Sequence, residues 1–339
     1  MRLAPLPGLR SQCEIIERAA VLDPTHAGCH KRRVNYRHAF HAGNFGDCVK
    51  HAVLVWLLRA LQRKPAPIFV LDTHAGVGRY DLATGPAART GEWRNGIARL
   101  LADPHPALRD YLAAVRSAAS LPSSWQAPEA APEAAIELGG CTGAVAVDGG
   151  EPEHYPGSPT LIRALLRPDD RLACCELHPE DAAALRQLFA PDRQVAVHQR
   201  DAWEALGALL PPKERRGLVL IDPPYEDRDE FAVLARGLAA AHARFANGVF
   251  VAWYPIKQRA PVRQFLAEMQ QTGIHDVVAA EHCLREPADP ARLNGCGLLV
   301  INPPYRFEAE VLPILEALLA RLGNREPGEY ATVTRITDE

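Results

Sequence analysis

The residues best suited to chemistry form the run Asp222-Pro223-Pro224-Tyr225, which directly follows the apolar stretch 217–221. Proline fixes its own φ and keeps the preceding residue extended, so the Asp222 carboxylate and the Pro223 carbonyl are expected side by side. Two such acceptors can hold both N–H bonds of an adenine amino group while its nitrogen becomes nucleophilic, and Tyr225 offers a face for base stacking. We therefore predict that Asp222, Pro223 and Tyr225 are catalytic. The alternative is an ordinary proline-stopped strand end.

A second group of residues could bind a nucleoside cofactor. The run 72–78 follows an earlier apolar stretch, and its two close glycines allow backbone to approach a ligand. Glu176 ends the next stretch, where an acid can bind two ribose hydroxyls, and Asp201 follows the third. Each acid alone is more often a solvated strand end, and Asp81 replaces the third glycine of a dinucleotide fingerprint. In chain order with Asp222, however, these features are typical of the S-adenosylmethionine site of a class I methyltransferase.

A near copy of the catalytic run, Asn302-Pro303-Pro304-Tyr305, follows another apolar stretch, 297–301. This stretch is the last of seven expected strands, and in a class I methyltransferase the seventh strand is antiparallel. Its carboxyl end should then face the edge of the sheet opposite the cofactor. We therefore predict a structural role for the second run.

A run rich in basic and aromatic residues precedes the apolar helix expected over 49–61. Between Lys31 and His51 the chain has five Lys or Arg against one acid, Asp47. The aromatic residues interleaved with these charges are typical of a nucleic-acid surface, with a solvated basic flank as the alternative. Four arginines further along the chain are candidates to extend this surface: Arg79, Arg89, Arg94 and Arg99.

The same run raises the question of a zinc site. His38 and His41 form an HxxH pair, and Cys48 and His51 form a CxxH pair, which are spacings that could hold zinc. The loop between the two pairs is only six residues long. We therefore expect no metal.

The elements that must position these residues are short apolar runs that end in turn or acidic residues. Seven are expected to be strands: 68–72, 171–176, 194–198, 217–222, 248–253, 276–283 and 297–302. Helical periodicity lies between most of them, at 181–189, 230–245, 262–272 and 308–322. This alternation predicts an α/β fold of the class I methyltransferase kind, a Rossmann-like, doubly wound sheet of seven strands with the last one antiparallel. Ligands then bind beyond the carboxyl ends of the parallel strands.

The first two expected strands are about a hundred residues apart, which is far more than one crossover helix needs. We therefore expect a methyltransferase core over 34–91 and 155–325, with an inserted helical subdomain at 92–154. This insertion would carry a mobile Ala/Pro-rich loop at 118–150. Residues 1–33 show no connected pattern, and we expect an irregular extension there, consistent with a misassigned start near Val34.

The composition is that of a globular enzyme. The chain has 339 residues, 47% of them hydrophobic, and a formal charge of -3, so any nucleic-acid contact depends on a local basic patch. The eight cysteines include no CxxC pair, which disfavours a disulfide framework and favours a reducing cytoplasm. The absence of a signal-peptide pattern and of a long apolar run argues against secretion and membrane spanning.

The chain resembles the RlmJ family of bacterial 23S ribosomal RNA adenine-N6 methyltransferases. The resemblance extends from about Asn35 to beyond Tyr305, and the motifs that carry it lie at 36–44, 49–51, 71–80, 155–159, 176–179, 221–226 and 253–255. It implies S-adenosylmethionine as cofactor and one specific adenine as target, adenine 2030 in the reference numbering of the RNA. It also implies an inserted helical subdomain between the first two strands.

The resemblance assigns site residues as well. It implies that the S-adenosylmethionine pocket is lined by His51, His74, Ser158, Glu176 and Asp201, and we add Lys50, Asp72, Gly76 and Ala202. It implies that Asp222 is catalytic and that Tyr36 contacts the RNA, to which we add Arg37 and His38. Family members typically have glycine at the position of Ala202, so the backbone contact to the cofactor adenine is expected to differ slightly.

Three function classes remain open from the residues alone: an RNA adenine methyltransferase, an amino-methyltransferase acting on DNA or protein, and a nucleic-acid-binding module without catalysis. The Asp in the catalytic run disfavours methylation of protein glutamine, so DNA adenine-N6 methylation is the nearest alternative. We expect 23S ribosomal RNA as partner, protein-free or in an early assembly form, recognised in a single strand or loop. We further expect a cytoplasmic monomer with no membrane association.

Overall fold

The computed structural model describes residues 38–119, 152–227 and 229–338. The expectations for residues 1–33, for Tyr36 and Arg37, and for 120–150 of the Ala/Pro-rich loop lie outside these ranges. No helix within the described ranges is both long enough and apolar enough to span a bilayer.

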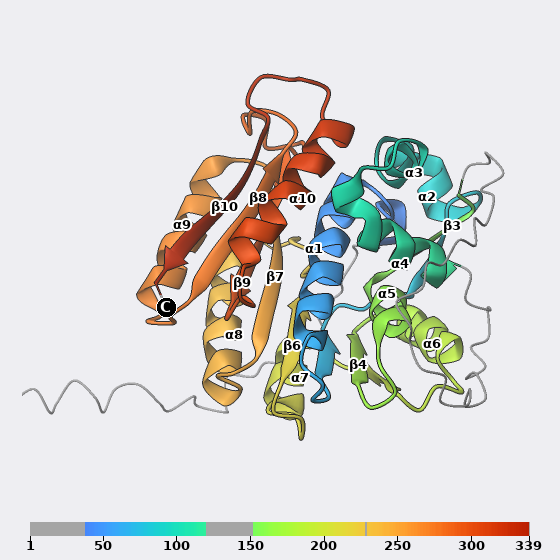
Figure 1. The fold of residues 1–339 in the computed structure, drawn as a ribbon, viewed down its shortest axis with the longest axis vertical. Helices are drawn as coiled ribbons and strands as arrows, with labels where there is room; N and C mark the ends of the chain where they lie inside the picture. Colours follow the sequence, from blue (N-terminus) through green and yellow to red (C-terminus); the bar gives the residue numbers. More distant parts are fainter. Residues whose placement is uncertain (1–37, 120–151, 228, 339) are drawn as a thin grey trace, which may run out of the picture. The chain divides into compact units, whose positions relative to one another are not determined.

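A mixed sheet of eight strands organises the fold (Figure 1). In spatial order the strands are β10 (Tyr330–Thr337), β8 (Val277–Cys283), β9 (Gly295–Ile301), β7 (Val249–Ile256), β6 (Gly217–Ile221), β1 (Phe69–Asp72), β4 (Arg171–Glu176) and β5 (Val195–Gln199). The strands from β7 to β5 pair in parallel, whereas β9 is antiparallel to both β7 and β8. The predicted α/β class and the antiparallel seventh strand are therefore confirmed.

The sheet is buried on both faces because alternate residues of each central strand enter two different cores. In β6, Leu218 and Leu220 pack into the core under α1 (Phe45–Gln62) and α10 (Phe307–Leu322). Val219 and Ile221 pack into the core under α7 (Ala202–Leu209), α8 (Glu230–Arg244) and α9 (Arg259–Gln271). Helices on both faces make this a doubly wound sheet. The remaining core helices are α5 (Ser158–Leu165) and α6 (Pro179–Leu188).

Helix α1 begins at the edge of the sheet where the parallel strands end. Asn44 caps it, because its side-chain oxygen accepts the Asp47 backbone N–H at 3.0 Å. Its residues from Gly46 to Val55 are all buried. Burial on nearly every side fixes the helix in place, so the polar side chains of its first turns are held at fixed positions beside the strand ends.

The segment between β1 and β4 contains a small sheet and several short helices. Strands β2 (Arg79–Asp81) and β3 (His154–Pro156) pair in antiparallel fashion. Between them lie α2 (Gly85–Thr90), α3 (Ile97–Ala102) and α4 (Arg109–Ala119), with 3₁₀ turns at Glu92–Asn95 and Pro106–Leu108. Helix α4 is amphipathic, and its buried side chains, among them Leu112 and Val115, face α1 and α5.

The strand count differs from the prediction, because β10 adds an eighth strand beyond residue 325, where we expected the core to end. It pairs with β8 in antiparallel fashion and forms an edge of the sheet. Its sequence, YATVTRIT, alternates β-branched residues with polar ones and contains no continuous apolar run. Such a pattern fits a half-buried edge strand, which a search for apolar runs misses.

Candidate active site

Three acidic residues meet at the carboxyl edge of the sheet. Asp72 ends β1, Glu176 ends β4, and Asp222 follows β6, and these strands are direct neighbours in parallel register. The backbone continues this arrangement past the strands, because the Thr73 N–H donates to Leu220 and the Ala75 N–H to Cys175. Residues far apart in the chain are thereby brought to one edge, as the order of motifs predicted.

Asp222 is paired with a buried lysine. Lys50 Nζ lies 2.6 Å from Asp222 Oδ2 and 2.9 Å from Asp47 Oδ1, and the lysine is only 4% exposed. Burial alone would lower the pKa of Lys50, but the charges of Asp222 and Asp47 together hold it well above its usual range. Lys50 is therefore an ammonium ion. Its side chain engages the predicted catalytic acid, and the cofactor contact that we predicted for Lys50 stays a prediction.

Asp47 connects this pair to the basic aromatic run. Its Oδ2 accepts the Gly43 backbone N–H at 2.9 Å and lies 3.0 Å from His38 Nε2. Burial would raise the pKa of Asp47, but the charges of His38 and Lys50 hold it well below its usual range. The ring of His38, a predicted RNA contact, also packs edge-on against Tyr80, with centroids 5.3 Å apart.

The four side chains considered as zinc ligands contact four different partners. His38 contacts Asp47, His41 contacts Glu92 at 3.0 Å, and His51 Nδ1 lies 2.7 Å from the hydroxyl of a tyrosine, Tyr155. Cys48 is buried and donates to a backbone carbonyl. Across the residues that the structure describes, no group of three or more His, Cys, Asp or Glu is arranged to hold a metal ion.

His51 is a neutral imidazole inside the core. Burial lowers its pKa to about 3. Its Nδ1 contacts Tyr155, whose hydroxyl lies 3.0 Å from that of Tyr111, while its buried Nε2 has no hydrogen-bond partner among the described residues. A buried ring nitrogen without a partner is a candidate contact for a ligand, in keeping with the role that we predicted for His51.

The glycine turn after β1 is held by Glu176. Gly76 has a positive φ of 61°, and a Cβ at this position would collide with the hydroxyl of Tyr80. The carboxylate of Glu176 accepts the backbone N–H groups of Gly76 and His178, one on each oxygen, both at 2.8 Å. Burial raises the pKa of Glu176 despite these two bonds. The turn and the acid thus form one rigid unit with acceptor capacity left over.

Asp72 and Ser158 form a second buried contact at the same edge. Ser158 Oγ donates to Asp72 Oδ2 at 2.6 Å, and burial raises the pKa of Asp72 to about 6 against this bond. His74 lies next to them, and its Nδ1 accepts the backbone N–H of Asp222 at 3.3 Å. Burial lowers the pKa of His74 to about 4, so the ring is neutral and acts as an acceptor that helps to fix the catalytic loop.

Asp201 and Ala202 begin α7. Asp201 caps the helix, because its Oδ1 accepts the backbone N–H groups of Trp203 and Glu204 at 2.9 and 3.2 Å. Both cap bonds fall on one oxygen, so the second carboxylate oxygen is open to another donor. Ala202 is buried. The cap therefore leaves an oxygen for the predicted contact to a cofactor adenine, which stays a prediction.

The side chain of Tyr225 is held firmly. Its backbone has a φ of 53°, its hydroxyl donates to the Trp253 carbonyl at 2.7 Å, and its ring packs against Trp253 and Phe231 with centroids 5.9 and 5.2 Å apart. Pro223 is buried, and none of the described N–H groups donates to its carbonyl. The loop therefore presents the Asp222 carboxylate and a carbonyl acceptor from a rigid base.

Two residues of the site were missed from the sequence. Asp47 entered only as the single acid of a basic run, although its i,i+3 spacing to Lys50 on a helix was a signal for an ion pair. Trp253 was noted only as part of a family motif, with no role of its own. Ile221 of β6 pairs with Ala252 of β7, so the next residues along the two strands, Asp222 and Trp253, are neighbours. Trp253 is half-buried on the face of the sheet that α1 covers. Its contact with Tyr225 makes it part of the catalytic loop's surroundings.

The second proline run follows β9, which is antiparallel to β7, and so lies at the opposite end of the strands from Asp222. Both amide hydrogens of Asn302 are used, because its Nδ2 donates to the carbonyls of Ala246 and Gly248 at 2.7 and 2.8 Å. Tyr305 is 87% exposed. This geometry agrees with the structural role that we predicted. Arg99, a candidate RNA contact, donates to the carbonyls of Leu322 and Gly323 at the end of α10.

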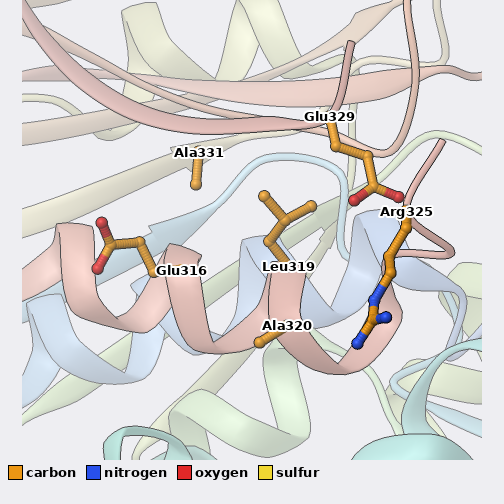
Figure 2. A pocket seen from close by; sticks show the side chains of 7 residues that line it. Glu316, Leu319, Ala320, Arg325, Glu329 and Ala331 are labelled. Carbon is orange, nitrogen blue, oxygen red and sulfur yellow. The ribbon is translucent and has the colours of Figure 1, made fainter. Parts of the chain in front are cut away.

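A separate groove of about 510 Å³ lies between α10 and the start of β10 (Figure 2). It is lined by Glu316, Leu319, Ala320, Gly323, Arg325, Glu329 and Ala331. None of the predicted site residues lines it, and its chemistry gives no reason to place the reaction there.

Comparisons with known proteins agree with the motifs. The family model described as "Ribosomal RNA large subunit methyltransferase D, RlmJ" matches residues 65–122 and 145–336. The chain is 36% identical to ribosomal RNA large subunit methyltransferase J of Escherichia coli K12, over 90% of this chain and all of that protein. It is 35% identical to the protein of the same name from Haemophilus influenzae Rd, with the same coverage of both chains.

A crystal structure of a Legionella pneumophila protein is also similar, with 33% identity and a TM-score of 0.71. The match covers 87% of this chain and 98% of the Legionella chain. With most of its length matched by the family model and by full-length relatives, this chain belongs to the RlmJ family of ribosomal RNA large subunit methyltransferases.

Proposed function

We propose that this chain transfers a methyl group from S-adenosylmethionine to the N6 amino group of one adenine in 23S ribosomal RNA. The observation that carries the proposal is the position of Asp222. This acceptor follows β6, on the sheet edge that also carries Asp72 and Glu176. An amino group bound at Asp222 would therefore lie beside acids suited to a nucleoside cofactor.

The residues at this edge fit S-adenosylmethionine. Glu176 accepts one backbone N–H on each oxygen and keeps lone pairs for ribose hydroxyls. The open oxygen of Asp201 suits an adenine amino group, and the unpartnered Nε2 of His51 suits a further polar contact. We assign Asp72, His74, Gly76, Ser158 and Ala202 to the same pocket. When bound, the cofactor supplies a methyl group on a positively charged sulfonium.

The chain's own residues then prepare the nucleophile. The Asp222 carboxylate and the Pro223 carbonyl each accept one N–H of the adenine amino group, which frees the nitrogen lone pair from the ring. Lys50 holds Asp222 through a single oxygen, Oδ2, and so orients the other oxygen toward the base. These contacts would orient the N6 lone pair toward the methyl group that the cofactor would supply, and the proton that the amino group must lose on methylation would pass to water.

Substrate recognition is assigned to the basic aromatic run and the insertion. We propose that Tyr36, Arg37 and His38 contact the RNA, and that the segment 92–154 is an inserted subdomain between the two parts of the core. Because A-form helices hide their base edges, the target adenine is expected in a single strand or loop of protein-free or early-assembly RNA. The protein would act as a monomer in the cytoplasm, where this RNA is assembled.

The test is methyl transfer from labelled cofactor to unmodified 23S ribosomal RNA and, in parallel, to duplex DNA. We expect label in the RNA only, and mass mapping of RNA fragments should find one N6-methyladenine, at adenine 2030. Label confined to DNA would overturn the choice of substrate. Glu176→Gln serves as a check on the pocket, because it should weaken cofactor binding, measured by calorimetry, without changing RNA affinity.

A further inference from the structure

We propose that Asp47 is a positioning residue that offsets the charge of Lys50, so that the acceptor end of the site carries a net negative charge. This inference rests on the proposed function. In this role Asp47 favours binding of the positively charged S-adenosylmethionine over its neutral product, S-adenosylhomocysteine. It also stabilises the positive charge that N6 gains during transfer.

The geometry ties Asp47 to the reacting end through one side chain. Asp47 Oδ1 lies 2.9 Å from Lys50 Nζ, which lies 2.6 Å from Asp222 Oδ2. Asp47 is 2% exposed and Lys50 is 4% exposed, so water screens neither charge well. The three groups therefore act on the site as one electrostatic unit.

The charge balance of this unit depends on Asp47. Lys50 and Asp222 alone sum to zero, and a buried ammonium ion 2.6 Å from the acceptor would oppose a positive charge on the bound amino group. With Asp47 ionised, the three groups sum to a net charge of about -1. Asp72, which also interacts with the charges of Lys50 and Asp222, adds a further negative charge when it is ionised. The neighbouring His51 and His74 rings add no charge, because burial lowers both pKa values below the neutral range.

The fold holds Asp47 in its ionised form against the effect of burial. It lies in the first turn of α1, where the helix dipole favours an anion, and Oδ2 accepts the Gly43 backbone N–H. His38 contacts the same oxygen at 3.0 Å. The acid is thus anchored by backbone on one side and contacts Lys50, the partner of Asp222, on the other.

The experiment compares two ligands that differ in charge at sulfur. Calorimetry at pH 8, where histidines are ordinarily neutral, would measure the affinities of S-adenosylmethionine and S-adenosylhomocysteine for the wild type and for Asp47→Asn. The variant keeps an oxygen for the Gly43 N–H but loses the charge. We expect the preference for the sulfonium to fall by roughly tenfold, with the affinity for the thioether changed by less than about twofold.

Controls separate a charge effect from structural damage. Asp47→Glu keeps the charge and should retain most of the wild-type preference. Asp170→Asn removes another buried, ion-paired acid, held by Arg167 away from this edge, and should leave the preference unchanged. If Asp47→Asn does not fold, as judged by circular dichroism, Asp47→Ser supplies a smaller neutral variant.

The inference would be contradicted if Asp47→Asn lowered the affinities for S-adenosylmethionine and S-adenosylhomocysteine equally, or left their ratio unchanged. Failure of the wild type to bind either ligand would instead contradict the proposed function.

Discussion

The two proline runs of this chain have nearly the same sequence but lie beyond opposite ends of the strands of one sheet. Asp222 follows a parallel strand, and its carboxylate contacts Lys50 in a buried setting. Asn302 follows an antiparallel strand, and its amide closes the loop between α8 and β7 through two backbone carbonyls. The tyrosines differ in the same way, because Tyr225 is packed and bonded whereas Tyr305 is 87% exposed.

This difference teaches that strand direction, and not the local motif, decides which run can carry chemistry. Where the parallel strands end, Asp72 and Glu176 lie away from water, and this burial raises the pKa of each carboxyl group. At the other end of the strands, both side-chain amide hydrogens of Asn302 are bound by backbone carbonyls. Variants at matched positions of the two edges should therefore have opposite consequences for activity and for stability.

The largest contrast is expected at the first residue of each run. Asp222→Ala should lower methyl transfer by on the order of a thousandfold, because it removes a preorganised acceptor of the amino group. Affinity for the neutral product S-adenosylhomocysteine should stay nearly intact, since Asp222 faces the base. Asn302→Ala should keep transfer within about twofold. Single-turnover assays and calorimetry measure both, and activity that survives at 222 but is lost at 302 would reverse the assignment.

Much of this contrast could be predicted from the sequence, because strands and their direction follow from apolar runs and chain order. The seven apolar runs are all strands, and the seventh is antiparallel. The eighth strand, β10, was missed because its residues alternate without an apolar run. The partner of Lys50 was also missed, since Asp222 is 172 residues away and only the folded sheet brings the two together.

The next prediction concerns Asp72 and how its ionisation makes the free energy of unfolding depend on pH. The pKa of Asp72, raised by burial to about 6, means that the folded state holds this proton more tightly than the unfolded chain does. Its contribution to stability is therefore present below about pH 4 and is lost as the pH rises to about 6. The side chain of the Asp72→Asn variant cannot ionise, so the variant does not lose this stability as the pH rises. We expect its free energy of unfolding to exceed that of the wild type by about 3 kcal/mol above pH 7, at the expense of cofactor affinity.

Urea denaturation of the wild type and of Asp72→Asn at pH 4.5 and pH 7.5 checks this prediction. The Asn side chain can still accept the hydrogen bond from Ser158, so packing is conserved. A difference between the two proteins that does not grow with pH would show that burial of the Asp72 charge is not the cause.

The aromatic residues of the two edges give a smaller contrast. Trp253 neighbours Asp222 and packs on Tyr225, so it is placed to support a base bound at the catalytic loop. Trp253→Leu should lower kcat/KM for RNA by about 5-fold to about 160-fold, the effect of losing roughly 1 to 3 kcal/mol of stacking. Trp253→Phe should recover most of it, and Tyr305→Leu should have no measurable effect. Equal losses at 253 and 305 would argue for general RNA contact and against base stacking.

The smallest effect is expected from the bonds that make Asn302 structural. Its two amide hydrogens bond the carbonyls of Ala246 and Gly248, partly in contact with solvent. Asn302→Ala should therefore lower the free energy of unfolding by about 1 to 2 kcal/mol, measured by urea denaturation, with no change in cofactor affinity.

Asn302→Asp is the sharper variant, because it recreates the catalytic run yet places a carboxylate against two carbonyl oxygens. It should destabilise the fold at least as much as the Ala variant and gain no methyl transfer in an Asp222→Ala background, since strand direction keeps it away from the site. Any recovery of transfer in that double variant would show that the local motif is sufficient after all.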